Sequence, residues 1–313
     1  MSGAGEALGA GGSMAGLAGL PHVIFVVGPT AAGKSAFAVQ LALETGGEII
    51  SADSMQVYRG FDLGTAKPSA EERKGVPHHM IDVVDPLEDY SAGAYSKDAQ
   101  AVIEEVLGRG RQPVVCGGSG LYVHALLYEE MDFSGRGRDV GLRARLELEA
   151  EEKGAAHLYQ RLLDADPEAA ARIHPNNIKR VIRALERASC GAEKGGLRDF
   201  SGTFEAQPRY DARIIRLTAD REALYARIER RVEAFFEAGL VREVRGLLEN
   251  GVPPGCTAMQ GIGYKEVASM LAGEYDEAEA IRLVKQNTRR YAKRQETWFK
   301  RYVDAELEVV EIF

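Results

Sequence analysis

The chain has 313 residues, of which 45% are hydrophobic and 27% are charged, a composition typical of globular proteins. Its formal net charge of −8 excludes a uniformly basic surface, although cations gathered in one place can still bind nucleic acid. Cys116, Cys190 and Cys256 lie far apart and form no C-x-x-C pair, which argues against a disulfide framework and a cysteine zinc site. We therefore expect a reduced, cytoplasmic protein.

The first 20 residues are almost entirely Gly, Ala, Ser and Leu, and no Lys or Arg precedes Lys34. A secretory signal needs a basic start and a transit peptide needs arginines, so neither is indicated. We expect residues 1–20 to form a disordered tail, with Met14 as an alternative start. No later stretch approaches the roughly 18 apolar residues of a spanning helix, so no membrane partner is expected.

A glycine loop follows the apolar run 23–27 and leads into a helical pattern over residues 36–43. The spacing satisfies G-x-x-x-x-G-K-[ST], a phosphate-binding loop in which backbone N–H groups and a helix N-terminus surround phosphate oxygens. The lysine adds a positive charge and the serine can hold Mg²⁺. The predicted diphosphate site comprises Gly28, Pro29, Thr30, Ala31, Ala32, Gly33, Lys34 and Ser35.

Residues 47–54 form a short β-type run that ends at Asp53 and Ser54. In an open parallel sheet, reactive groups gather at the carboxyl ends of strands, which is also where the phosphate loop lies. Asp53 is therefore placed to reach a ligand as a base, a Mg²⁺ ligand or a turn cap. The irregular stretch 55–68 then reads as a functional loop.

A strand is predicted within residues 77–86 and is stopped by Pro86. His78 and His79 are adjacent on it, so their side chains point to opposite faces and one metal site cannot easily use both. We interpret them as structural histidines.

Helical spacing over residues 95–107 and a buried-type strand over 113–116 continue the alternation of strands and helices. The next residues, 117–122, combine close glycines with the Ser119 hydroxyl, which indicates either a close approach to a ligand or a plain strand-to-helix turn. The alternation predicts an α/β fold with a doubly wound parallel sheet.

Strand character fades near Met131, and residues 140–188 read as four helices. The fourth carries Lys179, Arg183 and Arg187 at intervals of four residues, with Arg180 beside them, as either a phosphate-binding stripe or a solvated face. We predict a helical insertion domain over residues 133–204. Residues 21–132 and 205–313 would then form the phosphate-loop core.

The chain returns to a strand over residues 213–217, and Asp220 can cap the helix that follows. On that helix Arg227 and Arg231 lie one turn apart, which suits either bidentate phosphate contact or salt bridges with Glu229 and Glu233. A second glycine-punctuated loop occupies residues 258–265.

The last predicted helix spans residues 281–301 and contains one acidic residue, Glu296. Basic residues fall within about an 80° arc of its surface. They are Arg282, Lys285, Arg289, Lys293 and Lys300. Such a basic face on an acidic protein indicates contact with a nucleic acid backbone.

Several motifs together resemble the tRNA dimethylallyltransferase family, also called tRNA isopentenyltransferases. They are GPTAAGKS, ISADSMQVYRGFDLGTAKP, PHHMIDVVDP, CGGSGLY, ARIHPNNIKRVIRALE, QGIGYKE and NTRRYAKRQETWF, and they cover most of residues 23–299. Two departures are visible. Ser119 stands where the family has threonine, and residues 189–196 lack the usual T-G-K-P run.

The resemblance implies transfer of a dimethylallyl group from dimethylallyl diphosphate to N6 of the adenosine 3′-adjacent to the anticodon. Asp53 would accept the N6 proton, Ser119 would lie near the reacting atoms, and Arg231 would grip the diphosphate with Mg²⁺ held at Ser35. Contact with the tRNA anticodon stem-loop is implied for Asp53, Ser54, Met55, Gln56, Lys179, Arg180, Val181, Ile182, Arg183, Gln260, Gly261, Ile262, Gly263, Tyr264 and Lys265. A monomer is expected.

Three other functions remain to be weighed. A small-molecule P-loop kinase explains the phosphate loop and Asp53 but leaves the basic helix without a purpose. An isopentenyltransferase acting on free AMP or ADP shares the chemistry but needs no surface of tRNA size. A nucleotide-binding regulator of RNA would keep its function without Asp53.

Overall fold

The computed structural model describes residues 19–128, 140–189, 208–302 and 306–311. Nearly all of the expected tail over residues 1–20, and the departure at residues 190–196, lie outside these ranges. The chain divides into two compact units, residues 1–131 with 204–313 and residues 132–203. The sequence-based boundary of the insertion was 133–204.

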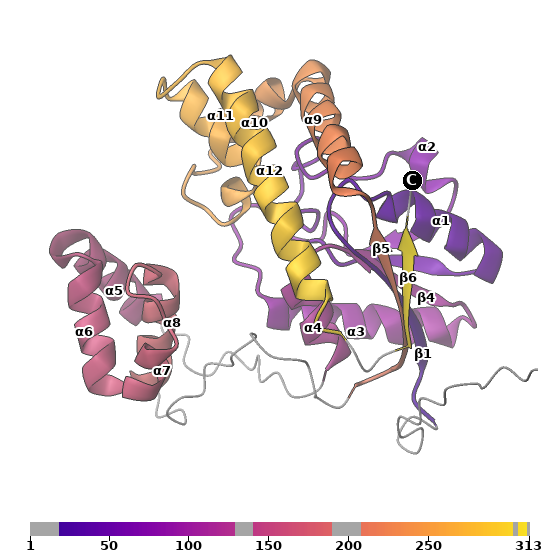
Figure 1. Cartoon of the computed structure of the whole chain (residues 1–313), viewed down its shortest axis with the longest axis horizontal. Coiled ribbons are helices and arrows are strands. Elements are labelled where there is room, and N and C mark those ends of the chain that lie inside the picture. The colour runs from indigo at the N-terminus through magenta and orange to yellow at the C-terminus, as the bar shows by residue number, and fades with distance from the viewer. Residues whose placement is uncertain (1–18, 129–139, 190–207, 303–305, 312–313) are drawn as a thin grey trace, which may run out of the picture. The chain divides into compact units, whose positions relative to one another are not determined.

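The first unit is built on a sheet whose described strands are all parallel, in the order β3-β2-β4-β1-β5-β6. This confirms the predicted doubly wound α/β sheet (Figure 1). The strands are β1 (His22–Val27), β2 (Glu48–Ser51), β3 (His78–His79), β4 (Pro113–Gly117), β5 (Asp211–Thr218) and β6 (Glu306–Glu311). β1 lies between β4 and β5 near the middle of the sheet. The loop that follows β1 therefore lies near the middle of the edge formed by the carboxyl ends of the parallel strands.

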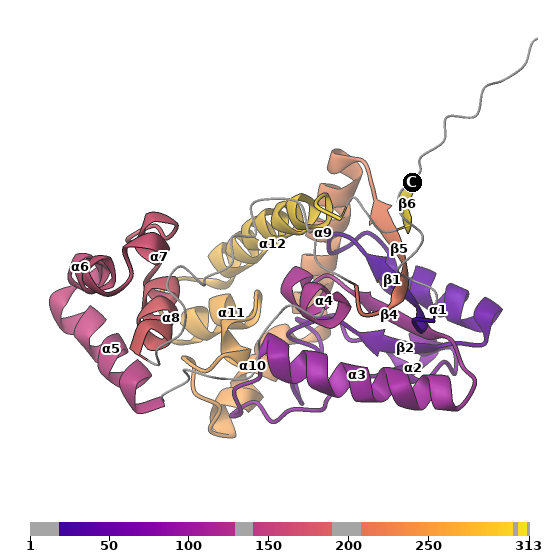
Figure 2. The ribbon, with the colours of Figure 1, turned by 90° about the horizontal axis from the view of Figure 1, so that it is seen from below.

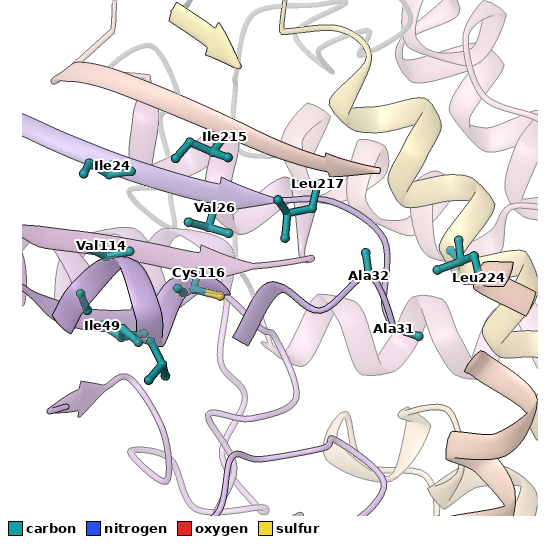
Figure 3. Close-up of a cluster of buried hydrophobic side chains, with 14 of the residues drawn as sticks. Ile24, Val26, Ala31, Ala32, Ile49, Val114, Cys116, Ile215, Leu217 and Leu224 are labelled. Atoms are coloured by element: carbon teal, nitrogen blue, oxygen red, sulfur yellow. The ribbon is translucent and has the colours of Figure 1, made fainter. Parts of the chain in front are cut away.

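Apolar side chains alternate between the two faces of the central strands, and both faces are covered by helices. On one face, Ile24 and Val26 of β1 gather with Ile215 and Leu217 of β5 (Figure 3). Helices α1 (Lys34–Thr45), α9 (Arg221–Ala238) and α12 (Glu277–Phe299) complete that core cluster. Burial on both faces explains why β1 reads as an unbroken apolar run.

Helix α3 (Ala92–Gly108) packs on β2 and β4, and on α4 (Gly120–Leu127), away from that cluster (Figure 2). The remaining helices of this unit are α2 (Ala70–Arg73), α10 (Leu240–Glu249), α11 (Tyr264–Leu271) and a 3₁₀ turn at Ala258–Gln260. Figure 1 shows α12, in yellow, running beside α9, in orange. None of the described helices is both long and apolar enough to cross a membrane.

The second unit contains α5 (Val140–Lys153), α6 (Ala155–Ala165), α7 (Pro167–Ala171) and α8 (Ile178–Ser189). It has a core of its own, with Leu146, Leu158 and Leu162 facing Val181 and Leu185. Asp166 is the N-cap of α7, because its carboxylate accepts the Ala169 N–H at 3.0 Å and proline follows at the first helical position.

The strand predicted within residues 77–86 is wrong in its extent. Only His78 and His79 pair with β2, because Met80 and Asp82 adopt positive φ angles of 62° and 58° that end the extended conformation. His79 Nε2 makes a 2.7 Å hydrogen bond with the buried Glu48 carboxylate. Helix α10 and strand β6 were not predicted.

Candidate active site

The phosphate loop joins β1 to α1 with a backbone that few residues adopt. Gly28 has a φ of 140°, and a Cβ there would lie 2.4 Å from the Leu217 carbonyl oxygen. Ala31 has a φ of 63° although it is not glycine, a strain that proteins keep mainly at functional sites. Gly33 caps α1 without a side-chain hydrogen bond. The first N–H groups of α1 therefore have no side-chain cap and are available to bind an anion.

Lys34 lies partly buried under this loop, and its ammonium donates to the Pro29 carbonyl at 2.7 Å. The pKa of Lys34 is lowered to about 8, mainly by burial and also by the nearby Arg231 charge, while Cys116 and Asp53 act in the opposite direction. A positive group held at this cost is suited to a strongly anionic ligand.

A cavity of about 380 Å³ opens beside the loop, at the carboxyl ends of β2 and β4. Its walls come from the phosphate loop, the segments after β2 and β4, and helix α9. They include Thr30, Ala31, Gly33, Lys34, Ser35, Ser51, Asp53, Gln56, Cys116, Gly117, Gly118 and Arg231. The cavity thus joins the predicted diphosphate site to the predicted base.

Asp53 is held through one carboxylate oxygen. Its Oδ1 accepts the Met55 N–H at 2.9 Å and the Gln56 N–H at 3.4 Å, while Oδ2 has no hydrogen-bond partner among the described residues. Burial raises the pKa of Asp53, against those two hydrogen bonds and the Lys34 charge. The geometry leaves one oxygen able to accept a proton in a site that strengthens its basicity.

Ser119 ties the loop after β4 to the Asp53 turn. Its Oγ accepts the Ser54 N–H at 2.9 Å and donates to Ser54 Oγ at 3.1 Å, and its own N–H donates to the Ala52 carbonyl at 3.1 Å. Sequence reasoning left open whether residues 117–122 form a plain turn, and the structure brings them against the predicted base.

Gln295 of α12 was missed by the sequence analysis. Its Oε1 accepts the Thr30 N–H at 2.8 Å and its Nε2 donates to the Gly118 carbonyl at 2.9 Å. The only sequence signal was its place in the motif YAKRQETWF, because nothing local shows that a helix glutamine reaches a loop 265 residues away.

The two arginines of α9 differ in position. Arg231 lines the cavity, and burial lowers the pKa of its guanidinium while Glu72 opposes that shift. Arg227, one turn earlier, is not part of the cavity wall. Arg231 is therefore the arginine placed to contact a bound diphosphate.

The residues expected to contact tRNA divide into exposed and buried ones. Gln260 and Lys265 are exposed, whereas Tyr264 is buried and its hydroxyl donates to Glu243 Oε1 at 2.5 Å. In the second unit Lys179 and Arg180 are exposed, but the side chains of Val181 and Ile182 lie in that unit's core. Arg183 donates to the fully buried Glu186 at 3.2 Å.

Three of the five residues of the basic face predicted on α12 form ion pairs. Lys285 pairs with Glu233 of α9 at 2.5 Å, and Arg289 pairs with Glu229 at 2.7 Å. Arg282 pairs with Glu279 of its own helix. Among the described residues, the exposed cations of α12 without an ion-pair partner are Arg290, Lys293 and Arg294, and Lys300 at the C-cap of the helix also has none. The unpaired cations therefore lie in the second half of the helix and at its end.

A metal ion would depend on few protein ligands here. Among the described residues no group of three or more His, Cys, Asp or Glu side chains can hold one. Ser35 is exposed at the first turn of α1, which fits the usual coordination of Mg²⁺ by one or two protein oxygens, substrate phosphates and water.

A family model described as IPP transferase matches residues 56–302 of the chain. The chain belongs to the IPP transferase family. One relative of this chain is the tRNA dimethylallyltransferase of Alkaliphilus oremlandii. The two are 49% identical over 281 residues, which are 90% of this chain and 89% of that protein. The tRNA dimethylallyltransferase of Symbiobacterium thermophilum is also 49% identical, over 90% of this chain and 87% of its own length.

Solved IPP transferase structures are similar as well. The full-length tRNA isopentenylpyrophosphate transferase of Bacillus halodurans aligns with a TM-score of 0.67 at 42% identity, covering 93% of this chain and 89% of that one. A eukaryotic dimethylallyltransferase acting on tRNA aligns with a TM-score of 0.77 at 28% identity, covering 93% and 74% of the two chains. The family assignment from sequence motifs is confirmed.

Proposed function

We propose that this protein transfers the dimethylallyl group of dimethylallyl diphosphate to N6 of the adenosine 3′-adjacent to the anticodon of tRNA, releasing diphosphate. Relatives named tRNA dimethylallyltransferase over 90% of the chain support this reaction. The observation that carries it is the free Oδ2 of Asp53 in the cavity that also holds the phosphate loop.

The phosphate loop binds the leaving group. The N–H groups at the start of α1 and the charges of Lys34 and Arg231 surround the diphosphate, so they stabilise the negative charge that grows on it as the C–O bond breaks. The Thr30 N–H already donates to Gln295. The Ala32 N–H donates to the Pro29 carbonyl at 3.3 Å, so the backbone donors come from the other residues after Thr30.

We assign Mg²⁺ to the same end of the site, with Ser35 as its protein ligand. When bound, the ion neutralises part of the diphosphate charge. The chain's own residues supply the remaining neutralisation through Lys34 and Arg231.

Asp53 acts as the general base. The exocyclic amine of adenosine is a poor nucleophile because its lone pair is delocalised into the ring, and attack on the allylic carbon leaves a proton on N6. Oδ2 of Asp53 accepts that proton, while the Met55 and Gln56 N–H groups fix the carboxylate through Oδ1. A positioned base of this kind contributes about 10²- to 10⁴-fold to the rate.

The acceptor is an anticodon stem-loop whose target base leaves its stack to enter the cavity. Exposed cations on both units suit its phosphates, namely Lys265, Arg290, Lys293 and Arg294 in the first and Lys179 and Arg180 in the second. Such contacts make affinity fall as salt rises. We place the reaction in the cytoplasm and assign it to a monomer.

The test is single-turnover transfer of labelled dimethylallyl, with Mg²⁺, to three acceptors side by side. These are unmodified tRNA with adenosine 3′ of the anticodon, AMP and ADP. Label on tRNA alone, lost in Asp53→Ala, supports the proposal. Label on AMP or ADP identifies a free-nucleotide enzyme, and ATP consumption without any transfer identifies a kinase.

A further inference from the structure

The Gln295 carboxamide is buried, with 5% of the residue exposed, and both of its polar atoms are hydrogen bonded to backbone far away in sequence. One partner is the Thr30 N–H of the phosphate loop, and the other is the Gly118 carbonyl of the loop after β4. A buried amide whose acceptor and donor are both used fixes two segments relative to each other.

The fit around this amide is close. A Cβ at Gly118 would lie 2.1 Å from Gln295 Nε2, so only glycine permits the approach. Tyr291, one turn earlier on α12, adjoins the same group. Burial and the Asp53 charge raise the pKa of Tyr291, and hydrogen bonding to Ser119 and Gln295 opposes the rise.

A continuous set of hydrogen bonds runs through the site. Thr30 bonds to Gln295, Gln295 to Gly118, and the next residue, Ser119, bonds through its Oγ to the Ser54 N–H. Ser54 directly follows Asp53. The leaving-group side and the base side of the cavity are thus joined through one side chain of α12.

We propose that Gln295 is a positioning residue, which sets the separation between the phosphate loop and the Ser119–Asp53 side of the cavity. The inference rests on the proposed transfer reaction. The phosphate loop holds the diphosphate and so positions the allylic carbon, whereas the Ser119–Asp53 side of the cavity positions the amine. A change in the separation of these two sides misaligns the amine with the allylic carbon, although each substrate still binds. Misplacement by about 1 Å can cost about 10²-fold in rate.

Gln295→Met removes both hydrogen bonds at nearly constant volume. With both substrates saturating, we expect its single-turnover rate to fall about 10²-fold. Its calorimetric affinities for dimethylallyl diphosphate and for tRNA should change little. A rate equal to that of the wild type overturns the proposal. A fall in the single-turnover rate that is no larger than the fall in donor affinity, or than the fall in the fraction of folded protein, also overturns it.

Gln295→Glu provides a second readout that a purely structural role would not move. An ionised carboxylate accepts from Thr30 but faces the Gly118 carbonyl with no proton, whereas the protonated acid can make both hydrogen bonds. Burial raises the pKa of such a carboxyl, so the ratio of variant to wild-type rate should rise about tenfold from about pH 8 to about pH 5.5. A flat ratio overturns the proposal.

The other titratable groups around the cavity cancel from this ratio because both proteins contain them. They are Asp53 after β2, Asp62 and Lys67 in the segment that follows, Glu72 of α2, His78 of β3, Lys34 of α1, Cys116 of β4, Arg231 of α9 and Tyr291 of α12. A matched control is Thr288→Val on the same face of α12, because its hydroxyl donates only within the helix, to the Val284 carbonyl. We expect wild-type transfer from it. Absence of transfer by the wild type itself contradicts the proposed function instead.

Discussion

At the scale of single residues, Asp53 combines a fixed orientation with a raised pKa. Replacement by Asn keeps the shape but leaves no proton acceptor, so we expect the single-turnover rate to fall about 10²- to 10⁴-fold while donor affinity is kept. Since only the ionised carboxylate accepts a proton, the wild-type rate should fall as pH falls through this raised pKa. A rate–pH profile of both proteins checks this. A midpoint at or below the pKa of an ordinary aspartate contradicts it.

Lys34 should make the affinity for dimethylallyl diphosphate depend on pH in the range above neutrality. Its pKa is about 8 in the free protein, and a bound diphosphate favours the charged form and raises it. Binding therefore takes up a proton, and affinity should weaken as pH rises above about 8. Calorimetric titration with dimethylallyl diphosphate across this range measures the effect.

Two variants control the Lys34 experiment. Lys34→Met should bind the donor more weakly and with little dependence on pH in this range. Lys97→Met, at an exposed position on α3, should keep the wild-type profile. An unchanged profile in Lys34→Met would assign the proton to another group.

At the scale of elements, α12 shows what the sequence of one helix does not report. Its basic residues were visible, but the carboxylates of Glu229 and Glu233 that neutralise two of them lie on α9, about 50 to 60 residues earlier in the chain. Pairing across helices depends on packing, which periodicity within one helix does not report. The same limit hid Gln295.

Other elements were predictable because their signal is local. The phosphate loop is formed by the backbone of eight consecutive residues, and the spacing of its glycines predicts that backbone conformation directly. Asp53 was found because it lies at the end of a short β-type run, two residues after the last residue of β2. The early end of β3 was not predicted, because the residue types at Met80 and Asp82 do not specify the positive φ angles found there.

The pairing on α12 predicts which cations bind tRNA. Lys293→Ala removes an unpaired exposed charge, so we expect weaker tRNA binding and a salt dependence reduced by about one phosphate contact. Lys285→Ala is the matched control, because its ammonium already pairs with Glu233. Equilibrium binding at several salt concentrations measures both slopes.

Donor affinity should be unchanged in both lysine variants. Equal loss of salt dependence in the two would show that the ion pair opens to bind RNA. That result would contradict the assignment of tRNA contact to the cations that have no ion-pair partner.

At the scale of the whole molecule, the two units have separate hydrophobic cores. Leu162 is fully buried in the second core, so Leu162→Ala should destabilise that unit by about 2–5 kcal/mol. Thermal unfolding followed by circular dichroism checks the loss. Binding of dimethylallyl diphosphate should be kept, whereas tRNA binding should weaken.

Val39→Ala makes the contrasting change. Val39 is buried in the first core, on α1 behind the phosphate loop, so donor binding should weaken in this variant. Loss of donor binding in Leu162→Ala as well would show that the cores do not act separately.

The position of the insertion in the sequence has a consequence for folding, because the chain is synthesised from its N-terminus. Within the first unit, the described residues that precede and follow the insertion pair at one antiparallel bridge between Tyr128 and Pro208, where the Arg209 N–H also donates to the Leu127 carbonyl. Strand β5 follows the insertion, so β1 keeps an open edge until residues 211–218 have been made, and open edges are prone to aggregate.

If the insertion folds first, the bridge and β1–β5 pairing close a short effective loop in place of one that includes the whole insertion. Slow folding of residues 132–203 would therefore prolong the time during which β1 can pair with another chain. The insertion thus affects how the sheet forms, although its described residues supply no strand to it.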